Sequence, residues 1–74
     1  MVSSGNQAAL SGTRAANSGI RLYEAYNNGY PISFGNLLSM KGRGSTELLM
    51  GWKSGANRMY YRSNSDINEG WSSW

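Results

Sequence analysis

The chain has 74 residues, no cysteine and no histidine, and a net charge of +3 from seven Lys or Arg against four Asp or Glu. This length allows one small domain with a thin core, and no disulfide can stabilise it. The same inventory excludes zinc sites of Cys and His, Ser-His-Asp triads and histidine general bases. We therefore expect a protein that is not an enzyme, with no cofactor and no metal site.

The basic residues are spread along the chain, which favours an ordinary solvated surface over a nucleic-acid interface. No apolar run approaches the roughly 20 residues that span a bilayer, and residues 1–12 lack the charged start and apolar stretch of a secretory signal. We expect no nucleic-acid partner and no membrane insertion. Hydrophobic residues make up 39% of the sequence, which is low for a miniature domain without disulfides, so self-association is the simplest way to complete its core.

Residues 1–17 are small and polar, and they predict a lead-in or linker that cannot form a core alone. A short helix around 7–16 is left open, with Gly12 and Thr13 as interruptions. From residue 18 the sequence pattern changes, and apolar side chains begin to alternate with polar ones. The chain thus divides into a lead-in, 1–17, and a domain, 18–74.

Alternation in the domain predicts four strands, at 20–26, 33–42, 46–53 and 58–63. Turn signals separate them: Asn-Gly and Pro in 27–31, two glycines in 41–45, and a Ser-Gly pair in 53–57. Strands that recur roughly every 8–12 residues with such turns are typical of an antiparallel meander. We therefore predict a mostly β fold, a small meander or knob.

The final stretch, RMYYRSNSDINEGWSSW (58–74), predicts a closing hairpin. Met59 and Tyr61 are expected to face the core, and Arg58 and Tyr60 to face outward. An arginine beside tryptophans can stack on an indole ring through a cation–π contact. The residues to which we assign such packing roles are Tyr61, Arg62, Trp71 and Trp74.

Five pieces of the chain follow a family pattern, in the order SGIRLYE, YPISFGNLLSMKG, TELLMGW, RMYYRS and GWSSW. This order resembles pyocin knob domains, the knob-like repeats in the tail fibres of bacteriophages and contractile-tail bacteriocins. The resemblance covers residues 18–74, and its most specific part is Tyr-x-Arg-Ser followed by Trp-x-x-Trp. The chain departs from the pattern at Glu47 and Leu48, where many knobs carry a Gln.

The resemblance implies a homotrimeric, non-catalytic segment of a virion tail fibre or of an extracellular phage-tail-like particle, released by cell lysis. It implies attachment to the bacterial host surface through lipopolysaccharide or another surface polysaccharide. Two alternatives stay open. One is a structural trimerisation or spacer module of a viral tail fibre or tailspike, and the other is a carbohydrate-binding appendage of a tailspike depolymerase.

Sugar sites combine aromatic faces with side chains that donate and accept hydrogen bonds. The ligand-binding candidates of this kind are Tyr26, Asn28, Tyr30, Arg58 and Tyr60. The first three lie at the predicted turn 27–31, where plain turn chemistry is the alternative. The glycine-rich 41–44 segment lacks the strand–loop–helix setting of a phosphate loop, and the acidic stretch 66–69 lacks the spacing of a calcium loop.

Overall fold

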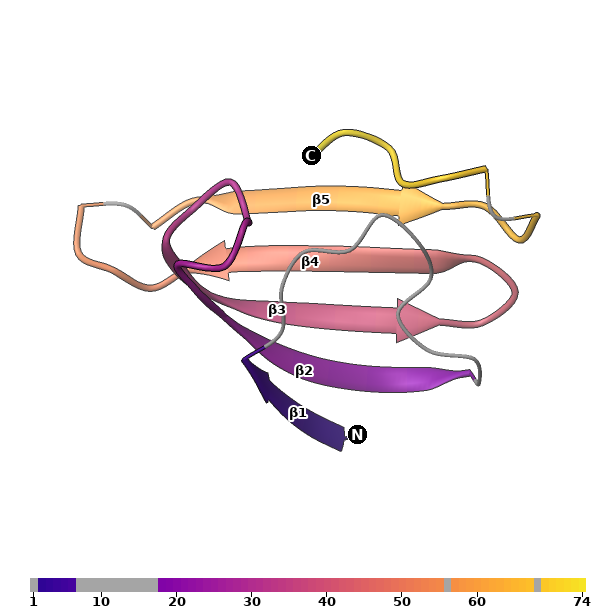
Figure 1. The fold of residues 1–74 in the computed structure, drawn as a ribbon, viewed down its shortest axis with the longest axis horizontal. Coiled ribbons are helices and arrows are strands. Elements are labelled where there is room, and N and C mark those ends of the chain that lie inside the picture. The colour runs from indigo at the N-terminus through magenta and orange to yellow at the C-terminus, as the bar shows by residue number, and fades with distance from the viewer. Residues whose placement is uncertain (1, 7–17, 56, 68) are drawn as a thin grey trace.

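Five strands form one sheet in the order β1-β2-β3-β4-β5 (Figure 1). The computed structural model describes residues 2–6, 18–55, 57–67 and 69–74. The strands are β1 (Val2–Asn6), β2 (Gly19–Tyr26), β3 (Phe34–Lys41), β4 (Ser45–Gly51) and β5 (Met59–Asn64). The described ranges contain no helix, and the predicted mostly β fold is confirmed. In the same ranges, no helix has the length and apolar character needed to cross a membrane.

Strands β2 to β5 form an antiparallel meander, and each begins and ends within two residues of the limits predicted by alternation. Strand β1 comes from the polar stretch that was expected to be a lead-in, and it pairs in parallel with β2. Backbone groups alone suffice to add a strand at a sheet edge, so a polar sequence does not prevent it. The helix left open around 7–16 lies outside the described residues.

The loop between β2 and β3 is shaped by its asparagines and glycine. Asn27 and Gly29 have positive φ, 54° and 99°, as expected for an Asn-Gly turn. The Asn28 side chain accepts a hydrogen bond from the Tyr26 backbone N–H at 3.0 Å and donates to the Glu24 carbonyl at 3.3 Å. These bonds fold residues 27–33 back over one face of the sheet.

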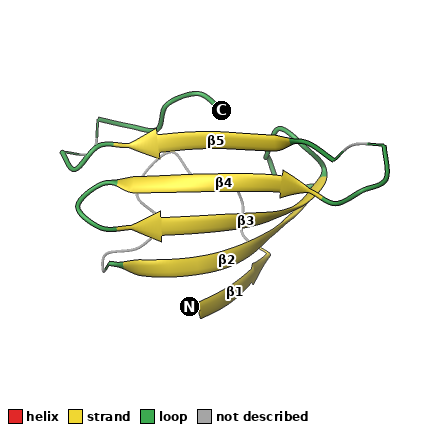
Figure 2. Ribbon diagram, turned by 180° about the vertical axis from the view of Figure 1, so that it is seen from behind, coloured by secondary structure: helices red, strands yellow, loops and turns green. Residues whose placement is uncertain are grey.

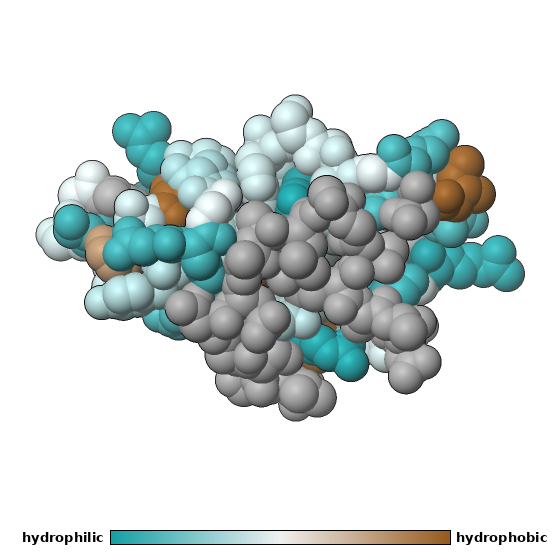
Figure 3. Space-filling view, in the orientation of Figure 1, coloured by the Kyte–Doolittle hydropathy of each residue, from teal (hydrophilic) through white to brown (hydrophobic). Residues whose placement is uncertain are grey.

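We call that face the buried face. It carries most of the described apolar core, which consists of Tyr23, Ala25, Leu37 and Leu49 from the strands and Tyr30 from the loop. The loop 27–33 and the C-terminal residues 69–74 lie on or beside it (Figure 1). Seen from this side, the described surface is mostly hydrophilic, with a few separate apolar spots (Figure 3). The opposite side, the outer face, has no described loop across it (Figure 2).

Strand β5 turns the opposite way from our prediction. Met59 and Tyr61, expected to face the core, lie on the outer face and are 69% and 56% exposed. Tyr60 and Arg62 lie on the buried face, because the register of β5 places them opposite Leu49 and Glu47. Alternation defines two faces of a strand but does not say which one is covered, and in β5 the covered face is the one with Tyr60 and Arg62.

Gly35 lies where two segments come closest, and it generates the first prediction. A Cβ atom there would lie 2.7 Å from the Met50 carbonyl oxygen and 2.9 Å from Ile32 Cδ1. The backbone of β4 cannot retreat without breaking the sheet, so Gly35→Ala is expected to lower the free energy of unfolding by about 1–3 kcal/mol. Urea denaturation followed by circular dichroism measures this.

Gly42→Ala is the matched control, because a Cβ atom at that position meets nothing within 4 Å. We expect its effect to stay within about 0.5 kcal/mol of the parent chain. Equal stabilities for the two variants would contradict the close packing of Ile32 and β4 around Gly35.

Candidate functional site

The most buried charges of the described chain form one ion pair. Arg62 is 5% exposed and Glu47 is fully buried. The Arg62 Nε–H donates to Glu47 Oε1 at 2.8 Å, and Nη2 of the same side chain lies 2.7 Å from that oxygen. The two residues are direct cross-strand partners on β4 and β5. A buried charge is tolerated only when it is paired in this way.

Two tryptophans enclose the same guanidinium. The Arg62 Cζ atom lies 4.2 Å from the Trp71 ring centroid and 4.5 Å from that of Trp74. Ser72 brings these rings into place: its backbone N–H donates to the Ser63 carbonyl at 2.8 Å, and its hydroxyl accepts from the Ser63 N–H at 2.9 Å. The predicted stacking of Arg62 on a tryptophan is present, on both rings.

Sequence reasoning missed Glu47 as the partner of Arg62. The available signal was the alternation of 46–53, which placed Glu47 on the same face as Leu49. The hairpin register, which the turn sets and the alternation does not, pairs it with Arg62. Because both charged groups are buried, this cluster has little surface to offer a ligand, and its chemistry is that of packing.

A second cluster consists of aromatic side chains. It lies where the end of β2, the start of β3 and the segment after β4 meet. Tyr26 and Phe34 contact edge to face, with ring centroids 4.8 Å apart, and Phe34 and Trp52 lie 5.5 Å apart. Tyr26 is 52% and Trp52 48% exposed. Lys53 Nζ sits 5.3 Å from the Phe34 ring centroid. We call Tyr26, Phe34 and Trp52 the aromatic cluster.

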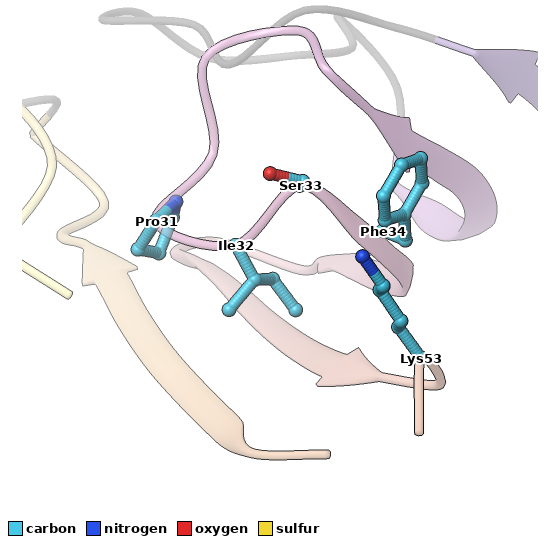
Figure 4. Close-up of a pocket in the computed structure, with 5 residues that line it drawn as sticks. All are labelled: Pro31, Ile32, Ser33, Phe34 and Lys53. Atoms are coloured by element: carbon cyan, nitrogen blue, oxygen red, sulfur yellow. The ribbon is translucent and has the colours of Figure 1, made fainter. Parts of the chain in front are cut away.

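A shallow pocket of about 230 Å³ adjoins this cluster (Figure 4). Its lining consists of Pro31, Ile32, Ser33, Phe34 and Lys53. The loop 27–33 supplies the first three residues, and the segment that follows β4 supplies the lysine. The Lys53 side chain rises along the pocket toward Phe34 (Figure 4). An apolar wall and a cation therefore border one opening.

The five predicted ligand residues do not come together. Tyr26 belongs to the aromatic cluster, and Arg58 is exposed at the start of β5. Asn28 makes the hydrogen bonds that hold the turn. Tyr30 is only 8% exposed and its ring contacts that of Trp74, with centroids 6.1 Å apart.

Tyr60 was expected to face outward, and this placement is wrong. It is half-buried and packs against the core, because its cross-strand partner is the buried Leu49. The ligand-binding roles of the five residues stay predictions. By position, Tyr26 and Arg58 have the most accessible side chains of the set.

Phe34, Trp52 and Lys53 were not among the predicted ligand residues. Alternation had placed Trp52 on one face with Leu48 and Met50, but only the register brings it beside Phe34: Gly35 pairs with Gly51, so the residues flanking these glycines become neighbours. Tyr26 joins them as the direct partner of Phe34. Three positions far apart in sequence thus form one surface.

The two weaker candidates show ordinary turn contacts. In the 41–44 turn the Gly42 N–H donates to the Gly44 carbonyl at 2.9 Å, and Arg43 is exposed. After β5, the Ser65 hydroxyl donates to Glu69 Oε2 at 3.2 Å, while Asn68 lies outside the described residues. Across the described part of the chain, no three Asp or Glu side chains gather as metal ligands would.

The outer face carries an apolar row across the sheet. Cross-strand pairing aligns Leu22 with Leu38, Leu38 with Leu48, and Leu48 with Tyr61. The three leucines are only half-buried, and Tyr61 is exposed. We call these four residues the outer row. A sheet with apolar side chains on both faces normally has both faces covered.

No protein-family model matches the chain, and no solved structure matches it with significance. The resemblance of residues 18–74 to pyocin knob domains therefore rests on the sequence pieces alone.

The buried ion pair generates the second prediction. Arg62→Met removes the cation and leaves the Glu47 carboxylate buried without it, which is expected to lower the free energy of unfolding by about 3–5 kcal/mol. The double variant Glu47→Leu with Arg62→Met is expected to recover most of this loss, because two apolar side chains can pack where the pair was. Chemical denaturation of the parent and both variants measures it.

Recovery of stability in the double variant would show that the loss in Arg62→Met comes from an unpaired buried charge and not from lost packing alone. If the double variant were less stable than Arg62→Met, then the carboxylate would be stabilised by other groups and the ion pair would not govern this part of the core.

Proposed function

We propose that this chain is a non-catalytic module of a bacteriophage or phage-like tail fibre, which self-associates as a homotrimer and attaches to polysaccharide or lipopolysaccharide on the bacterial surface. The observation that carries the proposal is the apolar outer face, which no described segment of the chain covers. A sheet of this kind is incomplete as a single chain, and a fibre module is completed by its own copies. The tail-fibre assignment and the number three rest on the resemblance to pyocin knob domains.

The outer face carries an apolar patch of the size that often marks an interaction site. Its most exposed apolar residues are Ile20, Tyr26, Trp52, Met59 and Tyr61, which are 45–69% exposed. Exposure near one half leaves on the order of 100 Å² on each such side chain. Tyr26 and Trp52 belong to the aromatic cluster at the rim, so Ile20, Met59 and Tyr61 contribute about 300 Å² beside the half-buried leucines, within the range of the patches that are often functional.

A second copy of the chain fits this face by its charge. Glu24 is the single charged residue that alternation places on the outer face of strands β2 to β5. The net charge of +3 therefore resides elsewhere, and three outer faces can approach a common axis without strong repulsion. In such a trimer the outer rows of the three chains supply the apolar side chains that pack around the axis.

Attachment to sugars is supported by the aromatic cluster. Exposed aromatic rings next to a cation are the side chains that bind the apolar faces and acidic groups of glycans.

The outer face favours one other function, a module that only trimerises or spaces the fibre, because that role needs the interface and no ligand. A binding measurement therefore decides between them.

The oligomeric state is the third prediction. Light scattering is expected to give a mass of about three times 8.1 kDa for the parent chain. Tyr61→Glu, which puts a charge into the exposed end of the outer row, is expected to shift the protein to a folded monomer. Asn57→Glu is the charge-matched control in an exposed loop and should leave the trimer intact.

Circular dichroism checks that Tyr61→Glu is still folded. Tyr61 is 56% exposed in the single chain, so its replacement should not unfold the sheet. A parent chain that is a stable monomer would remove the self-association argument altogether.

Binding to the cell surface is the fourth prediction. Purified lipopolysaccharide and capsular polysaccharide from a panel of bacteria, immobilised for surface plasmon resonance, are expected to retain the parent trimer in at least one case. The monomeric Tyr61→Glu variant should bind much more weakly, because three linked sites gain avidity of about 10²-fold or more. A trimer that binds none of these surfaces would favour the spacer module.

A further inference from the structure

We propose that the pocket between residues 31–34 and Lys53 binds a single hexuronic acid ring, a sugar that carries a carboxylate. This inference rests on the proposed function and names the class of sugar that the surface site would take. It uses Phe34, Trp52 and Lys53, which bring aromatic rings and a cation to the edge of a hollow.

The pocket offers an apolar wall for the C–H side of a ring. Pro31, Ile32 and Phe34 line it, and the Phe34 ring is held in place by Tyr26 on one side and Trp52 on the other. A ring that is fixed before the ligand arrives loses little conformational entropy on binding. The volume of about 230 Å³ is below the usual range of drug-sized pockets. It suits one ring at a time.

The charge in the pocket selects an acid. Lys53 is the only charged residue among those that line it, and no carboxylate is among them. The ammonium is exposed and lies against the face of Phe34, so it can exchange this weak contact for a charge-assisted hydrogen bond with a ligand carboxylate. A single ammonium matches a monoanion, such as a uronate, better than a phosphate dianion. The hydroxyl of Ser33 adds a partner for a ring hydroxyl.

The position of the pocket keeps it accessible in an assembly. It lies where β3 begins and just after β4 ends, with Pro31, Ile32 and Ser33 on one side and Lys53 on the other (Figure 4). The outer row crosses the middle of the sheet. Copies packed on the outer row would meet through the leucines. The pocket would then open at the rim of the interface, where a glycan chain can approach.

The test is a titration of the full ¹⁵N-labelled chain with methyl α-D-glucuronide, with neutral methyl α-D-glucoside as the comparison. Shifts are expected at the backbone amides of Phe34 and Lys53 and at the Trp52 indole N–H, and not at the indoles of Trp71 and Trp74. The glucuronide should bind about tenfold tighter than the glucoside, because one charge-assisted hydrogen bond distinguishes them. This preference should weaken as salt is raised.

Lys53→Gln is expected to remove the preference for the acidic sugar while leaving the weak binding of the glucoside. Arg43→Gln, which makes the same change in net charge in the exposed turn at the opposite end of the sheet, should leave the preference unchanged. Lys53→Arg should retain most of it. The aromatic residues are left intact in all three variants, so the fold is not at risk.

Equal affinity for the two sugars, the same affinities in Lys53→Gln, or shifts confined to other parts of the chain would each overturn the inference. These results are separate from the fate of the proposed function. Retention on a bacterial polysaccharide that is insensitive to Lys53→Gln would leave attachment standing and remove only this site. Absence of any polysaccharide binding would remove attachment, and the glucuronide titration would still decide whether the pocket binds an acidic ring.

Discussion

The ion pair between Arg62 and Glu47 is the interaction on which the rest of the structure depends. A domain this small has few apolar side chains to bury, and here it also encloses two charges. Pairing at 2.8 Å and the two indole faces around the guanidinium make this burial tolerable. The turn sets the register of β4 and β5, and the pair then holds Arg62 on the covered face, where Trp71 and Trp74 pack against its guanidinium.

The two faces of the sheet differ in an unusual way: polar groups are buried on one face, and apolar side chains are partly exposed on the other. The buried face holds a salt bridge, two serines and an asparagine beside its leucines, whereas the outer face presents Leu22, Leu38 and Leu48 in a row. In a soluble antiparallel sheet the solvent-facing side chains are normally polar. This reversal is hard to explain for a lone chain and follows naturally if the outer face is the centre of an assembly. The polar groups of the buried face are then the ones that each chain satisfies for itself.

The sequence predicted the strands well and the faces poorly, for a physical reason. Alternation and the glycine and asparagine turns located the four strands of the meander to within two residues. Adjacent leucines, as at 37–38 and 48–49, place an apolar side chain on each face, so period two cannot tell inside from outside. The inward assignment of Tyr61 failed on this point. Trp71 and Trp74 were placed correctly beside Arg62 because that argument used the chemistry of the side chains, whereas the aromatic cluster depended on register and was missed.

The buried ion pair, the outer row and the pocket occupy different parts of this small fold. The ion pair and the tryptophans lie on the buried face, the outer row crosses the middle of the opposite face, and the pocket lies where β3 begins and just after β4 ends. Phe34 links the last two, since it packs with Tyr26 and Trp52 at the rim of the outer face and lines one wall of the pocket. Lys53 is therefore separate from the core and the outer row is separate from the ion pair, so variants at these two places test the proposed binding and the proposed assembly without disturbing the core. The exposed loop residues Pro31 and Ser33 can vary in chemistry at little expense to the fold, because the hydrogen bonds of Asn28 and the packing of Tyr30 and Ile32 hold the loop from its other side.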